Sequence, residues 1–278
     1  MVLDRDPSTV TTSSLLAFAL ELADEADRVS MGFYRGELGT EAKADGSLVT
    51  LADKAVEARL RELIVARYPE HAILGEEQGH TPGASGTRWI IDPIDGTHGF
   101  TRGLPVWASL IAVEVDGRIE AGVASAPALG TRWWAGRGLG AYRGATGARS
   151  HAGERIHVSP VARLDAAQVL YGAWRYTADR WPGFTGLLRS AWRTRGYGDF
   201  WQHCLVAEGA AEVALEGDIS PWDIAALVVI LEEAGGRLTD DRGVPTIDAG
   251  HCVTSNGALH EETLRVLLGG AATTGAGW

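Results

Sequence analysis

The spacing of apolar residues predicts two helices at the start of the chain. Residues 13–31 repeat apolar side chains at helical spacing and place acidic side chains between them, with Thr12 or Ser13 available as a cap. A second helix is expected from Thr50 to Tyr68, and the proline that follows would end it. We therefore expect two helices that each bury one face.

Short apolar runs follow and predict a sheet. The runs are Ala72–Leu74, Arg88–Ile91, Trp107–Val115, Arg118–Ser125, Arg132–Trp134 and Gly140–Tyr142. A hairpin is expected at the Asp-Gly pair of residues 116–117. Polar or glycine-containing segments predict a loop or hairpin tip at Gly36–Asp45 and loops at His80–Thr87 and Gly144–Glu154.

From about residue 155, strand-like runs alternate with helical ones. The expected strands are Ala167–Tyr171, Ala211–Leu215 and Val253–Ser255. The expected helices are Phe184–Trp192, Phe200–Glu208, a helix capped by Ser220 that runs to Ala234, and Leu259–Leu268. This change of pattern predicts two subdomains, 1–150 and 151–278, with a frayed tail at the end.

Composition excludes some classes of protein. Of the 278 residues 45% are hydrophobic, which is ample for a packed core. The formal net charge of -11 argues against a nucleic-acid-binding surface. A phosphorylated substrate would then need metal ions to offset the acidic site. Cys204 and Cys252 are too few for a disulfide framework, and we expect reduced thiols.

The sequence shows no signal for secretion or for a membrane. The first ten residues carry acids rather than a basic region before an apolar core. No apolar run reaches the roughly 20 residues that a membrane span needs. We therefore expect a cytoplasmic protein without a membrane partner.

One stretch, Trp89–Thr97, places two carboxylates directly after an apolar run. Pro93 cannot donate to a sheet ladder, so we expect the chain to leave the sheet there with Asp92 and Asp95 exposed. Carboxylate oxygens suit Mg²⁺, which prefers oxygen ligands in octahedral geometry. The alternative is a strand followed by a turn with solvated aspartates.

Further acids lie at the ends of other elements. Glu76 follows the strand Ala72–Leu74, and Asp223 lies in the first turn of the helix capped by Ser220. If the fold gathers these side chains with Asp92 and Asp95, two divalent ions about 4 Å apart could bridge a phosphate and activate water. Alternatively, the helix dipole alone favours an acid at Asp223.

Thr97 and Asp53 supply the remaining chemistry. The Thr97 hydroxyl could hydrogen-bond the attacking water and relay its proton to Asp53, so that no side-chain nucleophile is needed. Each residue also has a structural interpretation. Asp53 has the capping-box spacing from Thr50, and Thr97 could simply complete a turn.

These motifs together resemble the inositol monophosphatase superfamily over nearly the whole chain. The motifs are Val49-Thr50-x-x-Asp53, Gly75-Glu76-Glu77, Trp89–Thr97, and Trp222-Asp223-Ile224-Ala225 followed by Glu233-Ala234-Gly235-Gly236. The resemblance implies an α/β fold layered as an αβαβα sandwich, hydrolysis of small phosphate monoesters, two or three Mg²⁺ ions per active site, and a homodimer.

The resemblance also assigns roles to individual residues. The expected metal ligands are Glu76, Asp92, the carbonyl of Ile94, Asp95 and Asp223, with Gly96, Thr97 and Asp223 also facing the substrate. Asp53 and Thr97 match the pair that activates water, with Glu76 at the same centre. Lys43 matches a loop lysine that approaches the metal site in some members, and Glu77 belongs to the same motif as Glu76.

Other segments are similar to the histidinol-phosphate phosphatase branch found in actinobacteria. They are Arg102–Trp107, Ser125–Leu129, Arg132–Trp134 and Gly196–Trp201. Asp199 in its aromatic surroundings would suit an ammonium or imidazolium group, and Glu216 matches a position that contacts the leaving alcohol. The alternative for Asp199 is a helix N-cap beside core aromatic residues.

We therefore expect a Mg²⁺-dependent phosphomonoesterase of histidine biosynthesis that acts on L-histidinol phosphate. Inositol 1-phosphate hydrolysis is the nearest alternative, followed by nucleotide 3′-phosphate and fructose bisphosphate hydrolysis. A catalytically silent regulatory member of the fold is the non-enzymatic alternative, against which the intact set of acids speaks.

Overall fold

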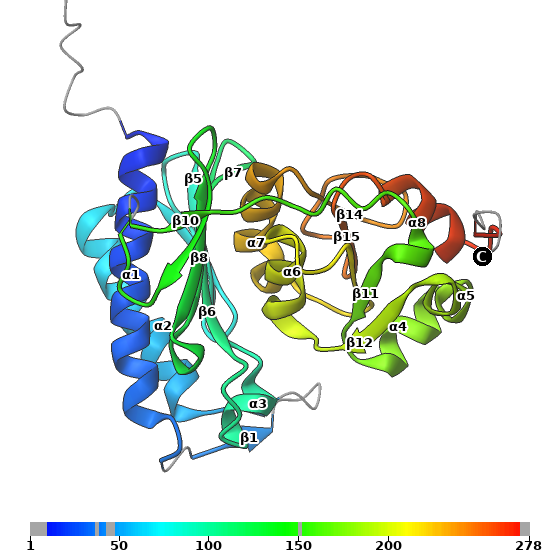
Figure 1. Ribbon diagram of the computed structural model, residues 1–278. Helices are drawn as coiled ribbons and strands as arrows, with labels where there is room; N and C mark the ends of the chain where they lie inside the picture. Colours follow the sequence, from blue (N-terminus) through cyan, green and yellow to red (C-terminus); the bar gives the residue numbers. More distant parts are fainter. Residues whose placement is uncertain (1–9, 37–38, 43–47, 150–151, 273–278) are drawn as a thin grey trace, which may run out of the picture.

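Five layers make up the protein (Figure 1). The computed structural model describes residues 10–36, 39–42, 48–149 and 152–272. In this part of the chain, a pair of helices covers an eight-stranded sheet, a second pair separates it from a five-stranded sheet, and three short helices cover the far face. This αβαβα order confirms the expected fold class.

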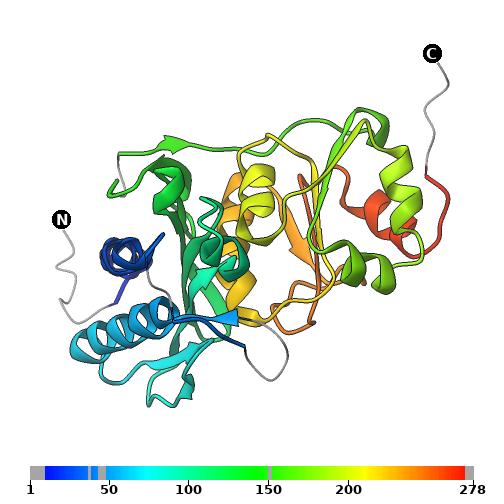
Figure 2. The same cartoon turned by 90° about the horizontal axis from the view of Figure 1, so that it is seen from below.

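The outer helices are α1 (Thr12–Phe33) and α2 (Leu51–Arg67). Figure 2 shows them side by side on the outer face of the eight-stranded sheet. The buried residues of both helices recur every three or four positions, so each helix presents an apolar face to that sheet. Both helices therefore form where the hydrophobic pattern predicted them.

The eight-stranded sheet has the order β10-β9-β8-β7-β6-β5-β3-β4. Its strands are β3 (Ala72–Gly75), β4 (Gly79–Thr81), β5 (Thr87–Asp95), β6 (Ala108–Val115), β7 (Arg118–Ala126), β8 (Thr131–Gly136), β9 (Gly140–Ala145) and β10 (Glu154–Arg155). Short elements beside it are β1 (Glu41–Ala42), which pairs with β2 (Leu48–Val49), helix α3 (Thr97–Thr101) and a 3₁₀ turn at Pro127–Leu129.

The five-stranded sheet has the order β12-β11-β13-β15-β14. Its strands are β11 (Gln168–Tyr171), β12 (Arg193–Gly196), β13 (Val213–Glu216), β14 (Arg237–Thr239) and β15 (Cys252–Ser255). The helices are α6 (Asp199–Ala207) and α7 (Pro221–Ala234) in the central layer, α4 (Trp174–Arg180), α5 (Phe184–Ser190) and α8 (His260–Leu267) in the outer one, and a 3₁₀ turn at Leu164–Ala166.

Helix α7 joins the two sheets through the largest core. Most of its apolar side chains are buried, with β6, β7 and β8 on one side and the second sheet on the other. A helix that is apolar nearly all round must be covered on every side. Helix α7 therefore sits in the central layer, and its first turn lies close to the ends of strands from both sheets.

Several expected boundaries were wrong, chiefly at sheet edges. Part of the loop expected at His80–Thr87 is strand β4, and β9 and β10 extend into both ends of the loop expected at Gly144–Glu154. The helix expected at Phe184–Trp192 ends at Ser190. The cap of α1 is Thr11, whose hydroxyl accepts a hydrogen bond from the backbone N–H of Ser14 at 3.2 Å. Pairing with a neighbouring strand decides where short strands form, and a local pattern does not carry that information.

The described residues do not test every expectation. Lys43 and the tail from residue 273 lie outside them. The division into subdomains at residue 150 stays a prediction, although β10 at Glu154–Arg155 still belongs to the first sheet. Within the described residues, no helix has the length and apolar character that a membrane crossing requires.

Candidate active site

Strand β5 carries the central acids through a bulge. The expectation that the chain leaves the sheet at Pro93 with both acids exposed was wrong, because β5 continues to Asp95 and the exposed fractions of Asp92 and Asp95 are only 1% and 8%. The register shifts between these two residues, since Asp92 faces Leu110 on β6 while Asp95 faces Ala108.

This bulge decides where the two acids point. In a regular strand, residues three apart lie on opposite faces of the sheet. The extra residue in β5 removes that alternation, so both carboxylates project to the same side. The backbone N–H of Ile94 donates to Asp92 Oδ1 at 2.9 Å, and the Ser109 hydroxyl donates to the carbonyl of Pro93 at 2.7 Å. One hydrogen bond within β5 and one from β6 therefore stabilise the bulge.

Gly96 turns the chain from β5 into α3 with φ of +83°, in the left-handed region that favours glycine. A Cβ atom at this position would lie 3.0 Å from the carbonyl of Val106. The tight turn places Thr97, the first residue of α3, directly beside Ile94. The Thr97 hydroxyl donates to the Ile94 carbonyl at 2.9 Å and lies 3.4 Å from Asp53 Oδ1.

Asp53 uses its two oxygens for different contacts. Asp53 Oδ2 accepts hydrogen bonds from the backbone N–H and the hydroxyl of Thr50, at 2.7 and 2.6 Å, which confirms the capping box. Oδ1 faces Thr97. Burial raises the pKa of Asp53. The capping and proton-accepting interpretations are therefore compatible, since each needs a different oxygen.

Glu76 lies in the turn after β3, and this turn is hydrogen-bonded to helix α2. The buried carboxylate of Glu57 accepts the backbone N–H groups of Glu77 and Gln78, at 2.7 and 3.0 Å. It also accepts the Nε–H of Arg61 at 2.8 Å. Because Asp53 and Glu57 are one helical turn apart, the same face of α2 positions Asp53 and the turn that carries Glu76.

Asp223 lies in the first turn of α7, where the sequence predicted it. The backbone N–H of Ser220 donates to Asp223 Oδ2 at 2.7 Å, and Pro221 occupies the first helical position. This contact fixes the carboxylate at the N-terminal end of α7, where the helix dipole also favours an anion.

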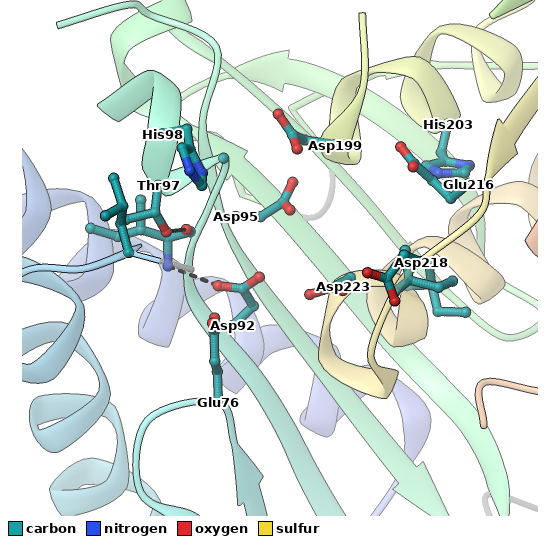
Figure 3. Close-up of a pocket in the computed structure, with 15 residues that line it drawn as sticks. Glu76, Asp92, Asp95, Thr97, His98, Asp199, His203, Glu216, Asp218 and Asp223 are labelled. Carbon is teal, nitrogen blue, oxygen red and sulfur yellow. Dashed lines mark hydrogen bonds between the residues drawn. The ribbon is translucent and has the colours of Figure 1, made fainter. Parts of the chain in front are cut away.

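The start of α6 contacts the same acids. The backbone N–H of Phe200 donates to Asp95 Oδ2 at 2.6 Å. Gly198 caps α6 without a side-chain hydrogen bond, so the interpretation of Asp199 as the N-cap was wrong. Asp199 has φ of +51°, which is uncommon for a residue other than glycine. Its carboxylate lines the cavity beside Asp95 (Figure 3).

These elements enclose an acidic cavity of about 190 Å³. Figure 3 shows its acidic side chains converging from β5, the turn after β3, α6, β13 and α7. Among the described residues that line it, none is a lysine or an arginine. The acids are Glu76, Asp92, Asp95, Asp199, Glu216, Asp218 and Asp223.

The acids of the cavity repel one another. Burial raises the pKa of Asp92 well above its usual range, and the charges of Glu76, Asp95 and Asp223 raise it further. Burial and then Asp199 raise the pKa of Asp95 in the same way. Burial raises the pKa of Asp223 to about 7. Such a cluster is costly to ionise without a positive charge among the acids.

The donor atoms fit a hard divalent cation. Asp92, Asp95 and Asp223 each offer a carboxylate oxygen, and these oxygens lie within 4.8 Å of one another. Glu76 lies beside them, and Ile94 also lines the cavity. An all-oxygen set of this kind is the one that Mg²⁺ prefers.

The pKa shifts predict how stability without metal depends on pH. A carboxyl group with a raised pKa binds more protons in the folded state than in the unfolded one, so the free energy of unfolding falls as pH rises through the folded pKa. With the pKa of Asp223 about 7 and those of Asp92 and Asp95 raised, we expect the melting temperature in EDTA to fall from pH 6.5 to 8.5.

Two buried histidines limit this prediction to pH above 6.5. Burial lowers the pKa of His203 to about 3 and that of His260 to about 4, and these shifts make stability rise with pH up to the unfolded value of 6.5. Thermal melts in EDTA and in Mg²⁺ would measure the effect, and Asp223→Asn should flatten the EDTA slope. A melting temperature in EDTA that rises above pH 6.5 would contradict the prediction.

The fold gathers most of the predicted site residues. Glu76, Asp92, Ile94, Asp95, Gly96, Thr97, Asp199, Glu216 and Asp223 line the cavity, and Asp53 touches it through Thr97. Glu77 is outside the lining, and its backbone N–H is bound to Glu57.

Sequence reasoning missed three polar residues of the cavity. His98 directly follows Thr97, and Asp218 lies two residues after Glu216. His203 lies one helical turn after Asp199, on the same face of α6, and its Nδ1 is 2.8 Å from the Thr254 hydroxyl. Helical spacing from Asp199 was the signal that could have found His203.

Comparisons with known proteins agree with this geometry. The family model described as the inositol monophosphatase family matches residues 11–269. A histidinol-phosphatase from Mycobacterium tuberculosis is 46% identical over 260 residues, which cover 92% of this chain and 98% of the relative. One from Streptomyces coelicolor is 42% identical, covering 91% of this chain and 96% of the relative. The structure of inositol monophosphatase from Anabaena superposes with a TM-score of 0.78 at 30% identity, covering 92% of this chain and 95% of that one.

Proposed function

This chain belongs to the inositol monophosphatase family, as its motifs predicted, and we propose that it is a Mg²⁺-dependent phosphomonoesterase that hydrolyses L-histidinol phosphate to L-histidinol and phosphate. The meeting of Asp92, Asp95 and Asp223 carries the proposed chemistry, because their oxygens converge from two separate elements. The relatives at 46% and 42% identity support the choice of substrate.

The carboxylates of Glu76, Asp92, Asp95 and Asp223, with the carbonyl of Ile94, would hold two or three Mg²⁺ ions. When bound, such ions offset the charge of the phosphate and activate water for in-line displacement at phosphorus. The cavity is acidic, so it would otherwise repel a phosphate monoester. The family's dependence on Mg²⁺ fits this requirement.

The chain's own proton acceptor is Asp53. The Thr97 hydroxyl takes a proton from the attacking water and donates its own to Asp53 Oδ1, the oxygen that Thr50 leaves free. Burial raises the pKa of Asp53, which makes it a better base than a solvated aspartate. Water adds to phosphorus as the bond from phosphorus to the alcohol oxygen breaks, and the leaving alkoxide takes up a proton from solvent and departs as histidinol.

The remaining groups position the substrate. Gly96 and Thr97 at the start of α3 would face the phosphoryl group, and Asp223 would also contact the ester. Asp199 and Glu216 lie on the side formed by α6 and β13, away from Glu76 (Figure 3). They would meet the alcohol. Glu216 is fixed there because the Gln202 side chain donates to it at 2.5 Å.

A phosphate-release assay tests the proposal. We expect L-histidinol phosphate to have a higher kcat/KM than inositol 1-phosphate, adenosine 3′,5′-bisphosphate or fructose 1,6-bisphosphate, and EDTA to abolish release from all of them. Higher activity on inositol phosphate would overturn the choice of substrate. No Mg²⁺-dependent release from any ester would overturn the proposed chemistry.

We also propose that the protein acts in the cytoplasm as a homodimer. Both proposals rest on the family resemblance and on the biosynthetic role of histidinol phosphate hydrolysis. Analytical ultracentrifugation tests the second, and a single species at the monomer mass would refute it.

The Glu57 contacts predict a loss of metal affinity in Glu57→Gln. The amide of glutamine replaces one acceptor of the turn that carries Glu76 and leaves the buried Arg61 without its ionic partner. Substitution of a residue that orients a metal ligand typically weakens metal binding by about 10- to 100-fold, and we expect that range in a calorimetric Mg²⁺ titration.

Glu62→Gln is the matched control, because Glu62 lies on the exposed face of the same helix. It should bind Mg²⁺ as the wild type does. If Glu57→Gln lowers the free energy of unfolding but leaves Mg²⁺ affinity unchanged, Glu57 only stabilises the fold.

A further inference from the structure

Asp218 lines two adjoining hollows. One is the acidic cavity, and the other is an open groove of about 350 Å³ lined by Tyr176, Asp179, Arg180 and Gly217. Figure 3 shows the Asp218 side chain beside Asp223, at the side of the cavity away from Thr97. Asp218 therefore lies between the acidic cavity and a groove along α4.

The cavity by itself is small for the proposed substrate. Its volume of about 190 Å³ is below the roughly 300–1,000 Å³ usual for small-molecule sites. The proposed metal ions and the phosphoryl group would occupy the part beside Asp92 and Asp95. The leaving alcohol must therefore extend outward, and the groove beyond Asp218 provides room for it.

Glu216 and Asp218 differ in how accessible their carboxylates are to a ligand. Glu216 is 8% exposed and accepts a hydrogen bond from Gln202. Asp218 is exposed, and no described residue donates a hydrogen bond to its carboxylate. It is close enough to add to the raised pKa of both Glu216 and Asp223. A cation that enters here would relieve this repulsion.

The groove is a fixed structure, because α4 packs directly on Gly217. A Cβ atom at Gly217 would lie 2.5 Å from the carbonyl of Tyr176, and Arg180 Nε donates to the carbonyl of Gly217 at 2.8 Å. These contacts set Asp218 at a constant position relative to α4. Tyr176 is 50% exposed and lines the groove.

We propose that this groove is the subsite for a cationic leaving alcohol, with Asp218 accepting a hydrogen bond from its ammonium or imidazolium group and Tyr176 contacting the same cation. This proposal rests on the proposed phosphatase function. It adds that Asp218 selects a cationic leaving alcohol over a neutral one. An aromatic face and a carboxylate together favour an organic cation over a polyol, because a polyol carries no charge for either group to attract.

The test is Asp218→Asn, measured on L-histidinol phosphate and on glycerol 3-phosphate, whose alcohol is neutral. We expect KM for histidinol phosphate to rise about tenfold. This is less than a buried charge-assisted hydrogen bond would give, because solvent weakens the interaction at an exposed position. kcat should change little, because the contact is present before and during the reaction. KM for glycerol 3-phosphate should change by less than about twofold.

Two further variants refine the result. Tyr176→Ala should raise KM for histidinol phosphate by about two- to fivefold through the lost aromatic contact. Asp248→Asn is the matched control, since Asp248 is an exposed aspartate that lines a separate hollow and its replacement removes the same charge. It should leave both substrates unaffected.

Binding of histidinol itself gives a readout that does not depend on turnover. In calorimetry with Mg²⁺-loaded protein, Asp218→Asn should weaken histidinol binding about tenfold while Mg²⁺ affinity stays at the wild-type value. Equal losses for both phosphate esters, unchanged histidinol binding, or a matching loss of Mg²⁺ affinity would each overturn the subsite.

Failure of the proposed function gives a different result from failure of the subsite. The proposed function fails if the wild-type enzyme does not prefer histidinol phosphate. In that case 2-aminoethyl phosphate replaces it as the cationic ester, and the ratio of its kcat/KM to that of glycerol 3-phosphate still measures what Asp218 selects. A ratio unchanged by Asp218→Asn overturns the subsite under either substrate.

Discussion

Replacing Asp92 by asparagine should lower kcat by at least about 10³-fold. The reason is that metal ions supply several kcal/mol of charge stabilisation in phosphoryl transfer. Asp92 lies at the centre of the acidic cluster, and the charges of Glu76, Asp95 and Asp223 all raise its pKa. Steady-state phosphate release at limiting and saturating Mg²⁺ would measure the loss.

The fold of this variant should survive. Asparagine keeps the oxygen that accepts the N–H of Ile94, and removing one charge reduces repulsion within the cluster. The melting temperature in EDTA should therefore equal or exceed that of the wild type. Asp240→Asn is the control, because Asp240 is a buried aspartate outside the cavity. Wild-type activity of Asp92→Asn at limiting Mg²⁺ would show that Asp92 holds no metal.

Thr97→Ala should lower kcat by about 10²- to 10⁴-fold, the range for general acid–base assistance. The hydroxyl bridges the Ile94 carbonyl and Asp53 Oδ1, and alanine removes both contacts without adding bulk. KM should change only modestly, because Thr97 faces the phosphoryl group but the carboxylates that would hold the metal ions are untouched. Thr97→Ser should retain most of the rate, which separates loss of the hydroxyl from loss of packing.

Thr101→Ala is the matched control, since Thr101 ends the same short helix and its hydroxyl donates to the carbonyl of His98. It should leave kcat unchanged. Asp53→Asn should lower kcat as Thr97→Ala does while the cap persists, because asparagine also caps helices well. Wild-type rates in both Thr97→Ala and Asp53→Asn would rule out the relay.

The sequence determined the main helices because their pattern is local. The apolar spacing in residues 13–31 describes a helix face, and Ser220 followed by Pro221 describes the start of α7. Both signals depend only on neighbours a few positions away. The four sequence motifs together likewise identified the family and the expected layers, and they contain four of the acids that line the cavity, Glu76, Asp92, Asp95 and Asp223.

Tertiary structure decided the side on which those acids meet. A regular strand would have turned Asp92 and Asp95 to opposite faces, and only pairing with β6 shows the bulge that brings them together. Their burial also depends on α6, because the backbone N–H of Phe200 in its first turn donates to Asp95. Sequence reasoning expected both acids in solvent because it treated Pro93 as the end of the strand.

Contacts between segments far apart in the chain could not be predicted from the sequence either. Glu57 belongs to none of the sequence motifs, yet it holds the turn that carries Glu76. Asp218 belongs to none of them either, and only the packing of α4 against Gly217 shows that it lines a groove. The sequence thus determined which groups are available for chemistry, whereas their directions and neighbours were decided by packing between elements far apart in the chain.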